Sequence, residues 1–144
     1  MPRPYLPVGK RRAVIERAQG CCEYCMSRAD YATETFAVEH ITPISLGGTD
    51  ELENLALSCS GCNGHKHDKV EAVDPVDGTL IPLFHPRRHY WHDHFAWSDD
   101  YRSIVGLTAT GRATVAALQM NRLPLMNMRA VLYLARKHPP KGDA

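Results

Sequence analysis

The chain has 144 residues, of which 44% are hydrophobic and 23% charged, and its formal net charge is +1. This length and composition are typical of one soluble domain, here 1–144. No apolar run approaches the roughly 18 residues of a membrane span, and residues 1–10 hold no secretory leader. We therefore expect a cytoplasmic protein with no membrane partner.

Charge is unevenly distributed along the chain. Residues 1–30 carry six Lys and Arg against three acidic residues, a net charge of +3. Residues 31–64 carry five acidic residues and no Lys or Arg, and residues 65–144 carry eleven basic residues against eight acidic ones. An acidic centre between basic flanks fits a divalent-metal site whose flanks approach phosphates, although solvated surface faces would give the same distribution.

Periodicity and turn residues predict the elements of the first half in chain order. They are a helix over 10–19, a short strand over 35–38 that ends at Glu39 and His40, a loop over 42–52, a strand over 55–58, and a helix capped by Ser60 that runs towards Val73. Strand, long loop, strand and helix make a ββα unit.

The second half predicts further small elements. They are an extended segment over 79–84, a hairpin over 95–107 that turns at Asp99 and Asp100, a helix over 111–121 capped by Thr110, and a helix over 125–137 with Pro124 in its first turn. An apolar stripe on the last helix should pack inward; its residues are Leu125, Met128, Leu132 and Ala135. The fold class expected is α+β.

Four cysteines form two C-x2-C pairs, Cys22 with Cys25 and Cys59 with Cys62, separated by 33 residues. Thiols stay reduced in an unsecreted protein, which favours metal ligation over a pair of disulfides. Four thiolates at this spacing can surround one Zn²⁺, and four protein ligands make such a site structural rather than catalytic. Cys21, the fifth cysteine, is interpreted as a bystander.

The residues between and beside the cysteine pairs suit phosphodiester hydrolysis. His40, with an ordinary pKa of about 6.5, is suited to take a proton from water. A hard cation could stabilise the phosphate, with Glu39 and Asn63 as its oxygen ligands. Strand alternation would turn Glu39 and His40 to opposite sides, so a bend at the strand end is required to bring both towards one cleft. The competing interpretation is that Asn63 is only a residue at the start of the helix that follows Cys62.

The segment VEHITPISLGGTDELENLALSCSGCNGHK, together with Cys22-Glu-Tyr-Cys25, resembles the HNH endonucleases, in the branch whose ββα-metal motif sits on a four-cysteine zinc site. The resemblance implies that His40 is the general base, that Glu39 and Asn63 hold Mg²⁺ or Mn²⁺, and that Asn54 fixes the loop around His40. The family often has Asp where this chain has Glu39, and His where it has Asn63. The motif core spans about 20–73, and 74–144 is a C-terminal extension.

Three further residues are candidates for contacts to nucleic-acid phosphates: Lys66, Arg87 and Arg88. Lys66 would otherwise lie on a solvated helix face. The histidine-rich segment 85–94 could bind a second metal, but its spacing fits no ligand template and its aromatic residues favour packing.

The sequence thus predicts a metal-dependent HNH endonuclease that cleaves DNA, with RNA not excluded and the oligomeric state open. The alternatives are a non-catalytic zinc module that binds nucleic acid or protein, and a thiol enzyme that uses Cys21 or Cys22.

Overall fold

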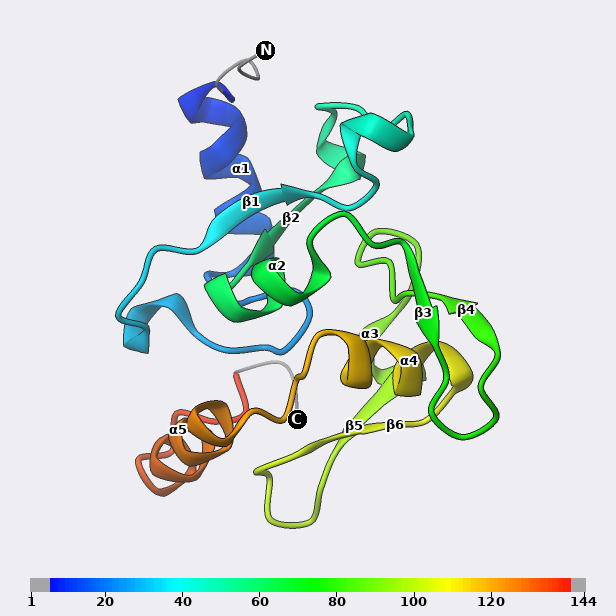
Figure 1. Ribbon diagram of the computed structural model, residues 1–144. Helices are drawn as coiled ribbons and strands as arrows, with labels where there is room; N and C mark the ends of the chain where they lie inside the picture. The colour runs from blue at the N-terminus through cyan, green and yellow to red at the C-terminus, as the bar shows by residue number, and fades with distance from the viewer. Residues whose placement is uncertain (1–5, 141–144) are drawn as a thin grey trace.

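A strand pair and the helix after it form the centre of the N-terminal half. The computed structural model describes residues 6–140 (Figure 1). Strands β1 (Ala37–His40) and β2 (Leu55–Ser58) pair antiparallel, and α2 (Ser60–Lys66) begins directly after Cys59. Three short 3-10 helices accompany them, at Ala29–Tyr31, Ile44–Leu46 and Leu52–Asn54. This order confirms the ββα unit that the sequence predicts.

Helix α1 (Val8–Ala18) packs along β2 and holds the strand ends (Figure 1). Val14 is fully buried against the core, as its position on the apolar face requires. Arg17 donates hydrogen bonds to the carbonyl oxygens of Leu52 and Leu55, at 2.9 Å and 2.6 Å. The helix therefore fixes the start of β2 by polar contacts as well as by apolar burial.

Helix α2 is shorter than the sequence predicts. Its N-cap is Cys59 rather than Ser60, and the Cys59 thiol accepts from the backbone N–H of Cys62 at 3.4 Å. It ends at Lys66 because His67 adopts a left-handed φ of 52°. The predicted continuation to Val73 is wrong: the chain turns after Lys66, and Glu71–Val73 forms a strand that pairs with Leu80–Pro82.

The C-terminal half is built from two small hairpins and short helices, which confirms the predicted C-terminal hairpin and helix pair. Helix α4 (Ala109–Ala117) contacts strands from both hairpins, and its N-cap is Thr108 rather than Thr110. Arg112 of α4 donates to both carboxylate oxygens of the buried Asp74. The elements are β3 (Glu71–Val73), β4 (Leu80–Pro82), α3 (Trp91–His94), β5 (Phe95–Trp97), β6 (Ile104–Gly106), α4 (Ala109–Ala117) and α5 (Leu123–Leu134).

Helix α5 buries less of its predicted stripe than its spacing indicates. Leu132 is buried and Leu125 packs against the core, but Met128 and Ala135 are exposed, and the other buried residue is Arg129. The helix lies across one end of the molecule, so only a narrow strip of it meets the core (Figure 1). No helix within residues 6–140 has the length and apolar character needed to cross a bilayer.

Aromatic side chains join the two halves. The indole N–H of Trp91 donates to the carbonyl oxygen of Tyr24 at 2.8 Å, and both residues are buried. The Phe84 ring meets Tyr24 edge-on at 6.4 Å between centroids and Phe95 at 5.1 Å. The extension therefore shares one core with the motif region, which explains the aromatic residues of segment 84–95.

The four paired cysteines converge in this core. Their Sγ atoms all lie within 4.8 Å of one another, and those of Cys25 and Cys59 are 3.6 Å apart. Four sulfurs at about 2.3 Å from one Zn²⁺ would be roughly 3.8 Å apart, so the cluster fits tetrahedral zinc. No disulfide joins any of the five cysteines, and Cys21 lies outside the cluster.

The histidine-rich segment forms a packed turn. The Nδ1 atom of His89 accepts from the backbone N–H of His85, and the Nδ1 atom of His85 accepts from that of Arg87. The His89 and His94 rings lie 4.9 Å apart, next to Phe84. Among the described residues, these histidines do not form a group of three potential metal ligands. Their hydrogen bonds and ring contacts are those of a packed segment.

We expect the purified protein to hold about one Zn²⁺ per chain, bound by the cysteine cluster. Cys62→Ser should reduce the zinc content and lower the melting temperature, because a structural zinc contributes its binding energy to folding. Zinc analysis and thermal unfolding check this. Cys21→Ser is the matched control, since it alters a buried thiol outside the cluster and should keep the zinc. Equal zinc in both variants would contradict the assignment.

Acid should destabilise the protein partly through His85. Burial, assisted by the nearby Arg88, lowers the pKa of His85 from 6.5 to about 4. The unfolded chain therefore binds this proton first, so the stability is complete above about pH 6.5 and is lost as the pH falls towards 4. His85→Asn keeps a side-chain acceptor for the turn but does not titrate.

Urea unfolding between pH 7 and pH 4 checks this prediction. The loss of unfolding free energy should be smaller in His85→Asn than in wild type. The cysteine cluster is the same in both proteins, so its own response to acid does not affect the difference between them. His67→Asn, at an exposed histidine, should follow wild type. Identical losses in all three proteins would rule out the role of His85.

Candidate functional site

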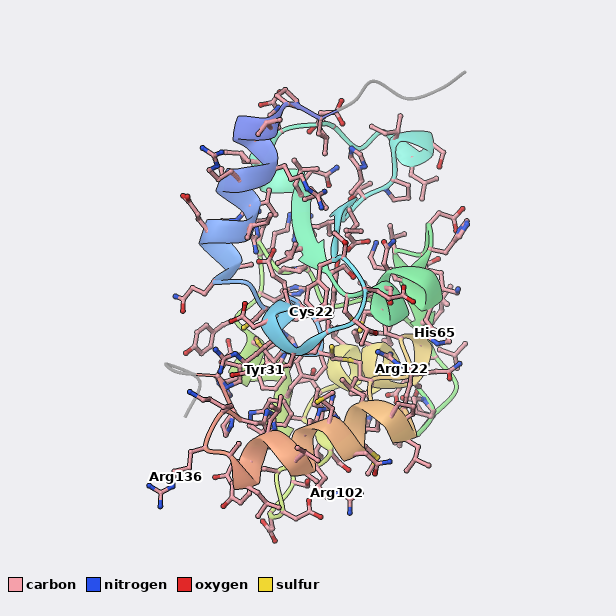
Figure 2. The ribbon with its side chains drawn as sticks, turned by 90° about the vertical axis from the view of Figure 1, so that its left-hand side faces the viewer. Cys22, Tyr31, His65, Arg102, Arg122 and Arg136 are labelled. Atoms are coloured by element: carbon pink, nitrogen blue, oxygen red, sulfur yellow. The ribbon has the colours of Figure 1, made fainter. Side chains whose placement is uncertain are left out.

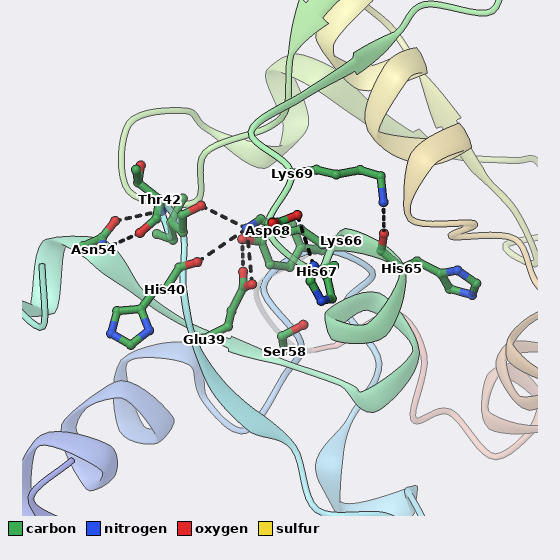
Figure 3. Close-up of polar contacts among 12 residues, drawn as sticks. Glu39, His40, Thr42, Asn54, Ser58, His65, Lys66, His67, Asp68 and Lys69 are labelled. Atoms are coloured by element: carbon green, nitrogen blue, oxygen red, sulfur yellow. Dashed lines mark hydrogen bonds and ion pairs between the residues drawn. The ribbon is translucent and has the colours of Figure 1, made fainter. Parts of the chain in front are cut away.

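The end of β1 presents Glu39 and His40 to different surroundings. The register pairs Glu39 with Ala56 and His40 with Leu55, and alternation along the strand sends the two side chains to opposite sides. Figure 3 shows the carboxylate of Glu39 directed towards Lys66 and the imidazole of His40 directed away from it. The bend that would turn both towards one cleft is not seen, so the pair is adjacent in sequence but has separate partners.

His40 is held by a residue that the sequence analysis missed. Its Nε2 atom lies 2.6 Å from Oδ1 of Asp50, and the His40 side chain is only 5% exposed. Asp50 belongs to the loop between β1 and β2, and its carbonyl oxygen accepts from Lys10 of α1. With Asp50 as acceptor, a neutral imidazole carries its proton on Nε2 and its lone pair on Nδ1. The sequence offers no signal for this pair beyond an acid in the loop.

Asn54 ties the loop to the end of β1. Its Oδ1 accepts from the backbone N–H of Thr42, and its Nδ2 donates to the carbonyl oxygens of Thr42 and Thr49, all within 2.9 Å (Figure 3). Gly48 permits this arrangement, because a Cβ there would lie 1.8 Å from the Thr42 oxygen and 2.8 Å from Asn54 Nδ2. These are the contacts of a residue that orients the backbone next to His40.

Glu39 and Lys66 form a buried ion pair. Their side chains are 5% and 1% exposed, and Nζ lies 3.3 Å from Oε2. The same ammonium donates to the carbonyl oxygens of Ile41 at 2.9 Å and His40 at 3.4 Å, while the Tyr24 hydroxyl donates to Oε1 of Glu39. Burial raises the pKa of Glu39, and Lys66 and Tyr24 oppose that rise. Both carboxylate oxygens therefore already have protein donors.

The structure does not place Lys66 on a solvated helix face, as one interpretation of the sequence expected. Lys66 is the last residue of α2, and its side chain returns under the end of β1. Helical spacing puts it on the same side of α2 as Asn63, three residues earlier. Asn63 is half-buried, and within residues 6–140 no hydrogen bond or ion pair links its side chain to Glu39 or His40.

The two candidate phosphate-binding arginines differ in their exposure. Arg87 pairs with Oε1 of Glu23, whose other oxygen accepts from the backbone N–H of Leu57 at 2.8 Å. Burial lowers the pKa of Arg87 to about 10, and its Nε is buried without a partner. Arg88 is exposed. The structure thus uses Arg87 to tie the extension to the first cysteine pair and leaves Arg88 at the surface.

The chemistry of these groups suits a hard cation and a base, but the geometry keeps them apart. Glu39 and Asn63 supply the oxygen donors that Mg²⁺ and Mn²⁺ prefer. The carboxylate fits a metal only when Lys66 or Tyr24 releases it. His40 has a carboxylate at one nitrogen and a fixed loop around it, which are features of a positioned base.

Two comparisons with known proteins bear on this region. Residues 22–69 match the family model of the HNH endonucleases. The chain is also similar to a type IV methyl-directed restriction enzyme, EcoKMcrA, of Escherichia coli (strain K12), with 23% identity over 74 residues. That match covers 49% of this chain and 27% of the relative, so it reaches only part of the restriction enzyme.

The matched segment contains the β1–β2 pair, the loop pinned by Asn54, helix α2 and all four clustered cysteines. Over residues 22–69, this chain is therefore similar to the HNH endonucleases.

Proposed function

We propose that this protein is a metal-dependent endonuclease that hydrolyses phosphodiester bonds in DNA. The observation that carries the proposal is the fixed environment of His40, which combines a carboxylate at Nε2 with a loop pinned by Asn54. The HNH match over the same residues supports a nuclease, and the relative, a restriction enzyme, supports a nucleic-acid substrate.

In this proposal His40 takes a proton from the attacking water through Nδ1. Asp50 accepts from Nε2 and so holds the ring in the required tautomer, as a carboxylate does for a catalytic histidine. Asn54 acts on His40 through the backbone rather than on the substrate. A divalent ion held by Glu39 and Asn63 would supply charge stabilisation at the phosphate and the leaving oxygen.

For Glu39 to serve as a metal ligand, Lys66 has to release it. The ammonium of Lys66 would then lie near the bound phosphate. In this proposal Lys66 pairs with Glu39 before the metal binds and contacts the phosphate afterwards. Arg88, exposed at the surface, is the other candidate for a contact to the nucleic-acid backbone, because such contacts position the substrate without reading sequence.

The second candidate function is a non-catalytic zinc module that binds nucleic acid or protein. One observation favours it: both oxygens of Glu39 are engaged by Tyr24 and Lys66, and His40 points to the other side of the strand. A binding module has no use for a positioned base. Catalysis therefore separates the two functions.

The His40→Ala variant should lose plasmid nicking in the presence of Mg²⁺ or Mn²⁺. Loss of a general base lowers the rate by about 10²–10⁴-fold, whereas the zinc content should not change, since His40 is not a cysteine ligand. Conversion of supercoiled to nicked plasmid, methylated and unmethylated, measures the effect. The matched control is His67→Ala, which removes an exposed histidine just after α2. Equal nicking by His40→Ala and wild type would leave the binding module as the better assignment.

Addition of Mn²⁺ should expose Lys66 to acylation. Lys66 is 1% exposed while it pairs with Glu39, so its reaction with an acylating reagent should be slow, and metal ligation by Glu39 should release it. Mass spectrometry after acylation with and without Mn²⁺ compares Lys66 with Lys69, which is exposed nearby and serves as the internal control. Nicking that requires Mn²⁺ while Lys66 stays protected would show that Glu39 is not the ligand.

A further inference from the structure

The cysteine cluster has a positively charged neighbour from the C-terminal half. Arg122 lies between the end of α4 and the start of α5, close to α2 (Figure 2). Its Nη2 is 3.7 Å from the Sγ atom of Cys59, and its Nη1 is 3.9 Å from that of Cys62. One guanidinium therefore reaches both sulfurs of the second cysteine pair.

The orientation of this guanidinium is fixed by backbone groups. Nη1 donates to the carbonyl oxygens of Leu118 and Gln119, both at 2.9 Å, at the C-terminal end of α4. Arg122 is also the N-cap residue of α5, so its own backbone is held where the two helices meet. The position of the guanidinium beside the sulfurs thus depends on the packing of α4 and α5.

Gly61 leaves the space that the guanidinium occupies. It lies between Cys59 and Cys62, and a Cβ at this position would be 2.5 Å from Nη2 and 2.6 Å from Cζ of Arg122. These are guanidinium atoms at the end of a side chain that the backbone of α4 holds. A larger residue at position 61 would therefore displace the guanidinium or be displaced by it.

Charge explains why a cation belongs here. Four thiolates around one Zn²⁺ leave a net charge of −2 in a buried cluster, since four negative charges meet two positive ones. Groups that donate to metal ligands orient them and hold the metal, and their loss typically costs about 10–100-fold in metal affinity. Arg122 is such a donor for both Cys59 and Cys62.

We propose that Arg122 is a positioning residue of the zinc site, and that through it the C-terminal half controls how firmly the motif region retains zinc. The inference is independent of nuclease activity, because it concerns only the sulfurs, the metal they fit and a neighbouring cation. It gives residues 109–134 a role beyond covering the core.

Transfer of zinc from the full chain to the chromogenic chelator 4-(2-pyridylazo)resorcinol, well below the melting temperature, tests the proposal. Arg122→Met should lower zinc affinity by about 10–100-fold. Arg122→Lys should recover part of this, since it keeps the charge but not the fork that reaches two sulfurs. Gly61→Ala should also lower the zinc affinity, and so speed the transfer of zinc to the chelator, although it removes no charge. Arg136→Met is the matched control, because Arg136 is an exposed arginine beyond α5 (Figure 2).

A second measurement separates positioning from a general loss of structure. In the Co²⁺-substituted protein, the thiolate-to-metal charge-transfer bands report the electron density at the sulfurs. Faster zinc release together with shifted bands in Arg122→Met or Gly61→Ala supports the proposal. Unchanged release in these variants, or faster release with unchanged bands, overturns it. Gly61→Ala carries the test if Arg122→Met does not fold.

Discussion

The convergence of four sulfur atoms from two distant segments is the constraint on which the rest of this structure depends. Cys25 and Cys59 are 34 residues apart in the chain, yet their Sγ atoms lie 3.6 Å apart. The cluster closes the loop that contains β1, the segment pinned by Asn54 and β2. Short strands of four residues hold few ladder hydrogen bonds, so they depend on such a closure for stability.

The buried charges of this region are arranged around that closure. Glu39 and Lys66 pair under the end of β1, and Glu23 and Arg87 join the first cysteine pair to the extension. Buried carboxylates are costly without a paired cation and further hydrogen bonds, and Glu39 and Glu23 each have both. Within the acidic centre, residues 31–64, Glu39 faces inwards, whereas Glu34, Glu51 and Glu53 are exposed. The motif region and the extension are coupled through polar groups as well as through the aromatic core.

Local signals in the sequence were sufficient for the order of elements and for the metal cluster. A run rich in β-formers preceded Glu39 and His40, glycine and proline marked the loop, and paired cysteines predicted convergence. These signals involve neighbours a few residues apart, where spacing translates directly into geometry. They fail at element ends: α2 stops at Lys66 because His67 takes a left-handed conformation, and α5 leaves Met128 exposed because little of the core reaches it.

The sequence by itself determined that the chain has a ββα unit, a four-cysteine cluster and the HNH residues in order. Only the tertiary structure decided their partners: Asp50 for His40, Lys66 and Tyr24 for Glu39, Glu23 for Arg87, and Arg122 for the cysteines. The physical reason is that each charged side chain must find a partner when it is buried. The chain offers many Lys, Arg, Asp and Glu residues, and packing between distant segments selects which of them meet.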